Sequence, residues 1–116
     1  MKERRLFPRS TITCKVSVVF GLRIIAFNAD IENICEGGMR IVLSEKLNVA
    51  TPLEIDIFNK QVYLKLKCEV IWNNEKFVKN AACGFDTGVK FIDITKDDME
   101  KIHKLMEVFA AEQKAA

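Results

Sequence analysis

Three arginines stand close together near the start of the chain, in the stretch ERRLFPR at positions 3–9. Arg5 and Arg9 have the spacing R-x-x-x-R, and Arg4 lies beside them. Each guanidinium is a planar cationic fork, and a local cationic patch can bind an anion even when the whole chain is nearly neutral. The segment therefore predicts an anion-binding arm, while a solvated N-terminal tail is the alternative interpretation.

A second polar stretch, NICEGG at positions 33–38, interrupts a pattern of alternating apolar residues. Gly37 and Gly38 predict a hairpin turn, because glycine adopts the positive φ angles that tight turns require. The stretch follows the apolar residues of one expected strand and precedes those of the next. It therefore places Asn33 and Cys35 at the end of a strand.

The basic charge of the chain is local. Its 116 residues carry 18 lysines and arginines against 16 aspartates and glutamates, a formal net charge of +2. A nucleic-acid-binding protein would have a larger basic excess, or aromatic residues interleaved with basic ones on one face. Tyr63 beside Lys65 and Lys67 is the sequence's weak indication of such interleaving. The apolar run at 16–22 is too short to span a membrane. We expect one domain that neither binds nucleic acid nor inserts in a membrane.

Residue types for catalysis or metal binding are scarce. The single histidine, His103, lies between Lys101 and Lys104, and it has the character of a solvated side chain. The four cysteines form no C-x-x-C pair, and no glycine-rich loop leads into a helix. We therefore expect no enzyme activity, no metal and no cofactor. Cys14 and Cys68 are expected to be buried thiols in a reducing cytoplasm.

Alternation of apolar and polar residues dominates positions 11–94 and predicts antiparallel strands joined by short turns. The segment 83–94 completes this β region. The apolar faces that the alternation predicts are Ile12, Cys14, Val16, Val18 and Phe20; Ile25, Phe27, Ala29 and Ile31; Met39, Ile41 and Leu43; Leu53, Ile55 and Ile57; and Val62, Leu64, Leu66, Cys68, Val70 and Trp72.

The period changes after the strands. Apolar residues then recur every three or four positions, which predicts an amphipathic helix over 95–112. Thr95 is the expected N-cap, with Asp98 three positions later. Six or seven strands followed by one helix predict a mainly β fold, an antiparallel β-barrel with a C-terminal α-helix, because closing a sheet removes its exposed edges.

The two polar stretches, in this order, resemble the PilZ domain family. The cyclic di-GMP receptors of that family carry an R-x-x-x-R motif in the N-terminal segment and, further along, a [D/N]-x-S-x-x-G motif at a strand end. Arg5 and Arg9 match the first motif. Asn33 and Gly38 match the ends of the second, with Cys35 in place of its serine. EVIW at 69–72 and TGVKF at 87–91 resemble later strands of the family.

The resemblance implies a single PilZ-like domain over 1–116, with a flexible Arg-rich segment at 1–10, a barrel at 11–94 and a helix at 95–112. It implies cyclic di-GMP as the ligand. The residues that would bind this ligand are Arg4, Arg5, Arg9, Asn33, Cys35 and Gly38.

The chemistry of these residues suits that ligand, which has two phosphates and two guanines. Arginine pairs with phosphate through two hydrogen bonds, reads the O6 and N7 atoms of guanine and stacks on bases. The Asn33 carbonyl can accept from a guanine N–H group, and Gly38 lets backbone approach closely. Cys35 is a weaker partner than serine, but one neutral hydrogen bond contributes only about 0.5–1.5 kcal/mol. Binding is therefore expected to be weakened but retained.

The family resemblance predicts a receptor or adaptor that transmits the second-messenger signal to an unidentified protein partner controlling motility, pili or exopolysaccharide. It leaves open whether the protein acts as a homodimer. The alternative is a ligand-independent PilZ-like adaptor, whose site is degenerate because Cys35 replaces serine. A direct titration with cyclic di-GMP separates the two hypotheses.

Overall fold

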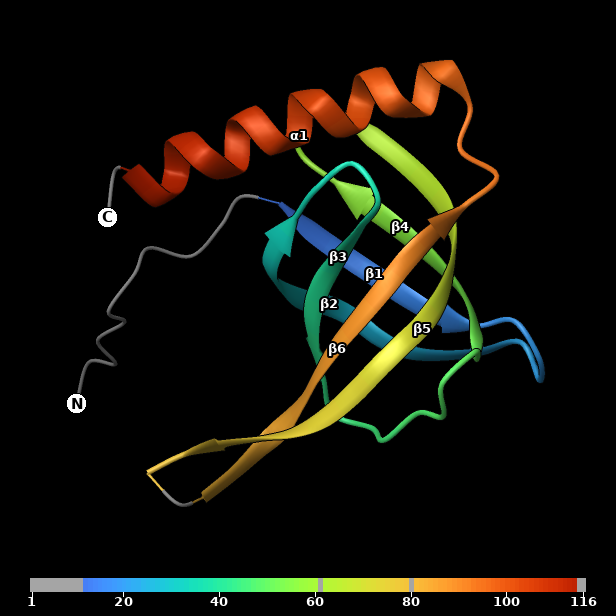
Figure 1. Cartoon of the computed structure of the whole chain (residues 1–116), viewed down its shortest axis with the longest axis vertical. Helices are drawn as coiled ribbons and strands as arrows, with labels where there is room; N and C mark the ends of the chain where they lie inside the picture. Colours follow the sequence, from blue (N-terminus) through green and yellow to red (C-terminus); the bar gives the residue numbers. More distant parts are fainter. Residues whose placement is uncertain (1–11, 61, 80, 115–116) are drawn as a thin grey trace.

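The computed structural model describes residues 12–60, 62–79 and 81–114, which form six strands and one helix (Figure 1). The sheet is antiparallel throughout and closes into a barrel in the order β1-β2-β3-β6-β5-β4. The predicted mainly β barrel with a C-terminal helix is confirmed. The elements are β1 (Thr13–Val18), β2 (Arg23–Ile34), β3 (Gly38–Leu43), β4 (Pro52–Phe58), β5 (Tyr63–Val78), β6 (Ala81–Ile92) and α1 (Lys96–Lys114).

The barrel interior is built by the residues that alternate along β1, β3, β4 and the first half of β5. Their side chains are almost fully removed from water, and removing apolar surface from water is the main favourable contribution to folding. The buried core of these four strands consists of Cys14, Val16, Val18, Met39, Ile41, Leu43, Leu53, Ile55, Ile57, Leu64, Leu66, Cys68 and Val70.

Two of the core residues are thiols, as expected. Cys14 and Cys68 are 0% and 1% exposed. Burial, which disfavours the thiolate, raises the pKa of each to about 12. Both side chains are therefore neutral at physiological pH, and they behave as small apolar groups.

Strand β2 departs from simple alternation. Cys14 pairs with Ala29 and Val16 pairs with Ala26, so β2 uses one more residue than β1 over this stretch. Such a bulge reverses the side of the sheet on which later side chains point. Phe27 is therefore 68% exposed. Phe20 lies in the turn after β1, outside the pairing of the two strands, and is 76% exposed. The prediction that these two phenylalanines belong to the apolar face is wrong.

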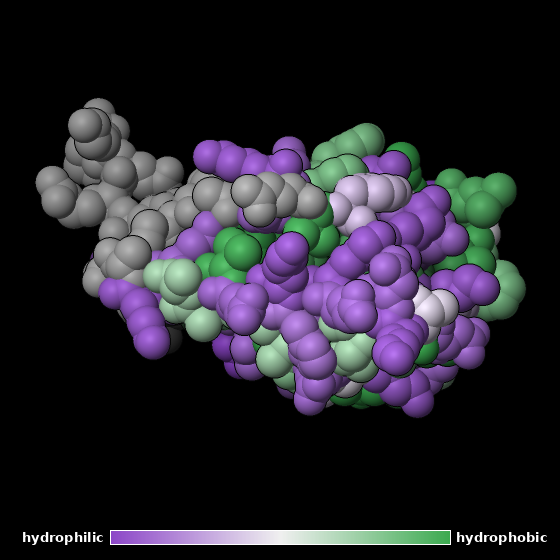
Figure 2. All heavy atoms as spheres, turned by 90° about the horizontal axis from the view of Figure 1, so that it is seen from above, coloured by the Kyte–Doolittle hydropathy of each residue, from purple (hydrophilic) through white to green (hydrophobic). Residues whose placement is uncertain are grey.

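The β1–β2 turn carries apolar side chains into solvent. Gly21 and Leu22 have positive φ angles of 85° and 48°, and the Leu22 N–H donates to Val19 O. Leu22 is 89% exposed. Figure 2 shows hydrophobic side chains gathered at the end of the molecule where this turn lies in Figure 1.

Helix α1 lies across one end of the barrel (Figure 1) and buries Ile102 and Leu105 completely. Thr95 caps it as predicted: the Asp98 N–H donates to Thr95 Oγ1 (3.0 Å), and the Thr95 N–H donates to Asp98 Oδ2 (3.2 Å). The helix continues to Lys114, beyond the expected end at 112. Within the described residues, no helix is long and apolar enough to cross a membrane.

Strands β5 and β6 are longer than the sequence pattern suggested. They extend as a hairpin beyond the rest of the barrel (Figure 1), and β5 alone has 16 residues. The expected strand ended at Trp72, because the following NNEK has no apolar alternation. The pairing of β5 with β6 continues as far as Val78 and Ala81, because the backbone hydrogen bonds of a hairpin do not require apolar alternation along the strand.

Candidate functional site

An open hollow of about 320 Å³ lies where the turn between β2 and β3 meets β5 and β6. Small-molecule sites commonly occupy roughly 300–1,000 Å³, so the hollow lies at the small end of that range. Its lining residues are Asn33, Cys35, Gly37, Gly38, Met39, Arg40, Ile71, Trp72, Gly88, Val89 and Lys90.

The three predicted residues of the second motif all line this hollow. The Cys35 N–H donates to Gly38 O (2.9 Å) and closes the turn, and the Cys35 thiol donates to the same oxygen at 3.3 Å. Asn33 and Cys35 are exposed. Within the described part of the chain no side chain hydrogen bonds to the Asn33 amide, so its carbonyl is open to a ligand donor.

The glycines of this turn serve a different purpose from the predicted one. Among the described glycines, positive φ occurs at Gly21 and Gly84, so the expected positive φ at Gly37 and Gly38 is wrong. A Cβ on Gly38 would instead lie 2.0 Å from Val89 O. Gly38 is therefore required because β6 passes too close for any side chain, whereas a Cβ on Gly37 would meet nothing within 4 Å.

Sequence reasoning missed the residues that face the motif across the hollow. Trp72 is partly buried and covers Gly88, on which a Cβ would lie 2.4 Å from the indole ring. Arg40 and Lys90 are exposed cations at the same hollow, and Lys90 Nζ lies 3.5 Å from Glu69 Oε1. The pairing of Trp72 with Gly88 comes from the register of β5 and β6, which no local pattern reveals.

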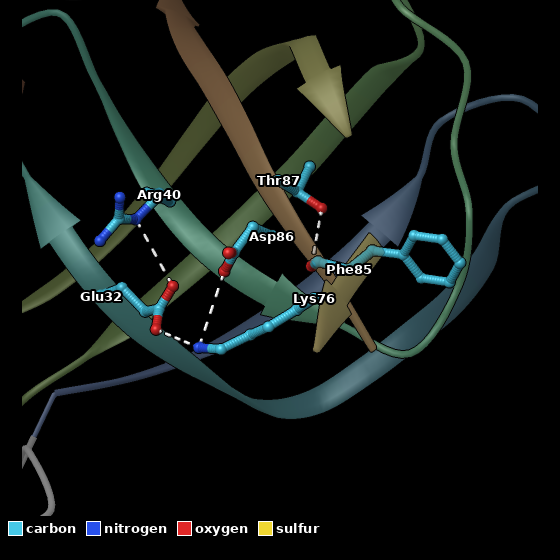
Figure 3. A network of polar contacts seen from close by, with 6 residues as sticks. All are labelled: Glu32, Arg40, Lys76, Phe85, Asp86 and Thr87. Atoms are coloured by element: carbon cyan, nitrogen blue, oxygen red, sulfur yellow. Dashed lines mark hydrogen bonds and ion pairs between the residues drawn. The ribbon is translucent and has the colours of Figure 1, made fainter. Parts of the chain in front are cut away.

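Arg40, which lines the hollow, is the first of a chain of charged residues that continues to Asp86 (Figure 3). Arg40 Nε lies 3.4 Å from Glu32 Oε1, and the other Glu32 oxygen accepts a hydrogen bond from Lys76 Nζ. Lys76 Nζ also lies 3.8 Å from Asp86 Oδ1, an ion pair too long to be a hydrogen bond. The four charges sum to zero and join β3, β2, β5 and β6.

The first motif cannot be placed. Arg4, Arg5 and Arg9 lie outside the described residues, as does the segment predicted to be flexible, so their roles stay predictions. His103 is exposed, and its Nε2 lies 2.5 Å from Glu36 Oε2 in the β2–β3 turn. Among the described residues, no three histidine, cysteine or carboxylate side chains group as metal ligands would.

Comparison with known proteins identifies similar chains. A family model described as PilZ domain matches residues 3–107. The fold is similar to the PilZ domain with c-di-GMP of YcgR from Escherichia coli, with a TM-score of 0.70 and 14% identity over 97% of this chain and 95% of that chain. It is also similar to MrkH of K. pneumonia in its apo state, with a TM-score of 0.73 and 15% identity. That match covers 100% of this chain and 54% of MrkH, so the chain spans about half of that protein. No curated protein matches the chain by sequence.

Proposed function

The chain belongs to the PilZ domain family, and on this premise we propose that it is a cyclic di-GMP receptor domain that passes the signal to a partner protein. The observation that carries the proposal is the hollow at the β2–β3 turn. It gathers Asn33, Cys35 and Gly38, the residues that match the second family motif. The similar YcgR domain, whose structure contains c-di-GMP, supports the same ligand.

The described lining can meet each part of such a nucleotide. The Asn33 carbonyl would accept from a guanine N–H group, and exposed Arg40 and Lys90 would attract phosphate. The Trp72 ring offers a surface for a base. Arg5 and Arg9 would supply further guanidinium forks from the N-terminal segment. Each of these residues would bind the nucleotide, and none is assigned a role in breaking or forming a bond. The proposed role is therefore a receptor and not an enzyme.

The proposed output is a protein partner in motility, pili or exopolysaccharide production. The β2–β3 turn offers a starting point for signal transfer, because Glu36 in that turn contacts His103 on α1. A ligand that moves the turn would change this contact. The proposed location is the cytoplasm, a reducing compartment in which the free thiols of Cys14 and Cys68 stay reduced.

A ligand-independent adaptor is the second candidate, and Cys35 is the observation that favours it. Its thiol donates to Gly38 O inside the turn, so its hydrogen is directed at the protein and not at the hollow. Compared with a site in which a serine hydroxyl at this position donates to the ligand, this site has one hydrogen-bond donor fewer. Binding would be weaker by about 0.5–1.5 kcal/mol on this account, which is insufficient to abolish it.

Calorimetric titration with cyclic di-GMP tests the proposal, with GTP and a single-stranded oligonucleotide as controls. We expect saturable binding of cyclic di-GMP, and weaker binding of both controls. Arg5→Ala and Arg9→Ala should each weaken it by more than about tenfold, since a hydrogen bond to a charged group contributes about 1.5–3 kcal/mol. Arg23→Ala is the matched control, because Arg23 is exposed, pairs with Glu45 and lies outside the hollow. Absence of binding would favour the adaptor.

A further inference from the structure

The register of β2 and β3 brings a carboxylate and an arginine together at the hollow. Ile31 pairs with Ile41 and Asn33 pairs with Arg40, so Glu32 is an additional residue on β2. This bulge sets both Glu32 and Asn33 against the single residue Arg40. Bulges of this kind redirect side chains and are frequent beside functional sites.

We propose that Arg40 is a further ligand-contacting residue, which donates to a phosphate oxygen of the nucleotide, and that Glu32 is the positioning residue that aims it. The inference rests on the proposed function and deepens it. Neither residue belongs to the two sequence motifs that suggested the ligand.

The ion pair with Glu32 leaves the terminal nitrogens of the Arg40 guanidinium free to bind a ligand. The shortest approach of Glu32 to Arg40 is that of Oε1 to Nε, at 3.4 Å. In Figure 3 the dashed line from Arg40 to Glu32 starts at Nε, and one terminal nitrogen of Arg40 is turned away from Glu32. Within the described part of the chain these terminal nitrogens form no hydrogen bond with a carboxylate. The Arg40 side chain is 48% exposed and lines the hollow, so these two nitrogens are available as the fork that pairs with a phosphate.

Glu32 can orient Arg40 without cancelling its charge, because Glu32 already has a second cation. Lys76 donates to Glu32 Oε2, and Asp86 lies on the far side of Lys76. The Glu32 and Lys76 side chains are much less exposed than Arg40. The three side chains on β2, β5 and β6 therefore hold the Glu32 carboxylate in place, and this carboxylate orients the guanidinium of Arg40.

Arg23, which lies on β2 as Glu32 does, provides the contrasting arrangement. Glu45 accepts two hydrogen bonds from Arg23 Nη1, at 2.8 and 2.9 Å. A terminal nitrogen of Arg23 is thus already occupied, whereas those of Arg40 are not. Arg23 is therefore an internal control: an exposed arginine paired with a glutamate, on β2, away from the hollow.

A double-mutant cycle tests both roles by calorimetry with cyclic di-GMP. Arg40→Ala should weaken binding about tenfold, and Arg40→Lys should not restore it, because lysine lacks the fork. Glu32→Ala should weaken binding about threefold when Arg40 is present and should change nothing in the Arg40→Ala background. Arg23→Ala should bind as the wild type does. Thermal melts confirm that each variant folds.

Affinities of Arg40→Ala within about twofold of wild type would overturn the contact. An equal effect of Glu32→Ala in both backgrounds would overturn the positioning role, because Glu32 would then act independently of Arg40.

A second measurement separates this inference from the proposed function. In ¹⁵N spectra, the Nε–H signal of Arg40, assigned by its loss in Arg40→Lys, should exchange with water faster in Glu32→Ala. GMP, which carries one phosphate, should shift that signal and leave the Arg23 signal in place. If wild type does not bind cyclic di-GMP, the proposed function fails. A GMP-induced shift then still supports the Arg40 site, and an unmoved Arg40 signal refutes it.

Discussion

Gly38→Ala is the substitution with the most direct structural consequence. The added Cβ would lie 2.0 Å from Val89 O and 3.1 Å from Lys90 Cα, both backbone atoms of β6. Backbone cannot rotate away as a flexible side chain can, so β3 and β6 must separate at the point where Gly38 pairs with Lys90. Overpacking of this kind costs about 1–3 kcal/mol. A weakened ladder hydrogen bond adds about 0.5–1.5 kcal/mol.

We therefore expect Gly38→Ala to lower the free energy of unfolding by about 2–4 kcal/mol. The neighbouring substitution Gly37→Ala is the matched control, because a Cβ there meets nothing within 4 Å and the backbone φ is not positive. It should be neutral, or stabilising by about 0.4–1 kcal/mol, since alanine restricts the unfolded chain.

Urea denaturation followed by circular dichroism measures both variants, with the slope against urea concentration checked for a constant value. The same reasoning predicts that Gly38→Ala weakens cyclic di-GMP binding, because the turn that carries Cys35 must move with β3. Equal stability of the two variants would refute the close approach of β3 to β6 as the reason for glycine at position 38.

Three further predictions concern single side chains. Cys14 and Cys68 have a pKa of about 12 in the fold against an ordinary 9.0. The thiols of the unfolded chain ionise at a lower pH than those of the folded chain. Their contribution to the free energy of unfolding should therefore be fully present below pH 9. Between pH 9 and 12 it should be lost at about 1.4 kcal/mol per pH unit for each thiol. In urea titrations at increasing pH, the free energy of unfolding should fall less steeply for Cys14→Ala than for the wild type. Leu22→Asn should stabilise the protein by about 0.5–1 kcal/mol in thermal melts, because asparagine tolerates the positive φ of that exposed position better, and an unchanged or lower stability would contradict this. Cys35→Ser should tighten cyclic di-GMP binding in calorimetry by about 0.5–1.5 kcal/mol, and weaker binding would mean that the thiol has a role of its own.

Local patterns in the sequence were sufficient for much of the fold. Alternation along β4 and the first half of β5 predicted the buried apolar residues from Leu53 to Val70, because one face of a barrel strand is always covered. The cap at Thr95 was equally readable, since it depends on residues three positions apart. The grouping of Asn33, Cys35 and Gly38 at one turn also follows from sequence, because the three are neighbours along the chain.

Tertiary structure decided what depends on the register between distant strands. Two bulges in β2 exposed Phe27 and set Glu32 against Arg40, and a bulge changes the side of the sheet without changing the composition of the strand. The requirement for glycine at position 38 comes from the carbonyl of Val89, some fifty residues away along the chain. Neighbours in a sheet are set by hydrogen bonding across strands. Arg40 follows Gly38 by two positions on β3, but only the pairing of β3 with β6 and of β6 with β5 shows that Trp72, Gly88 and Lys90 line the same hollow.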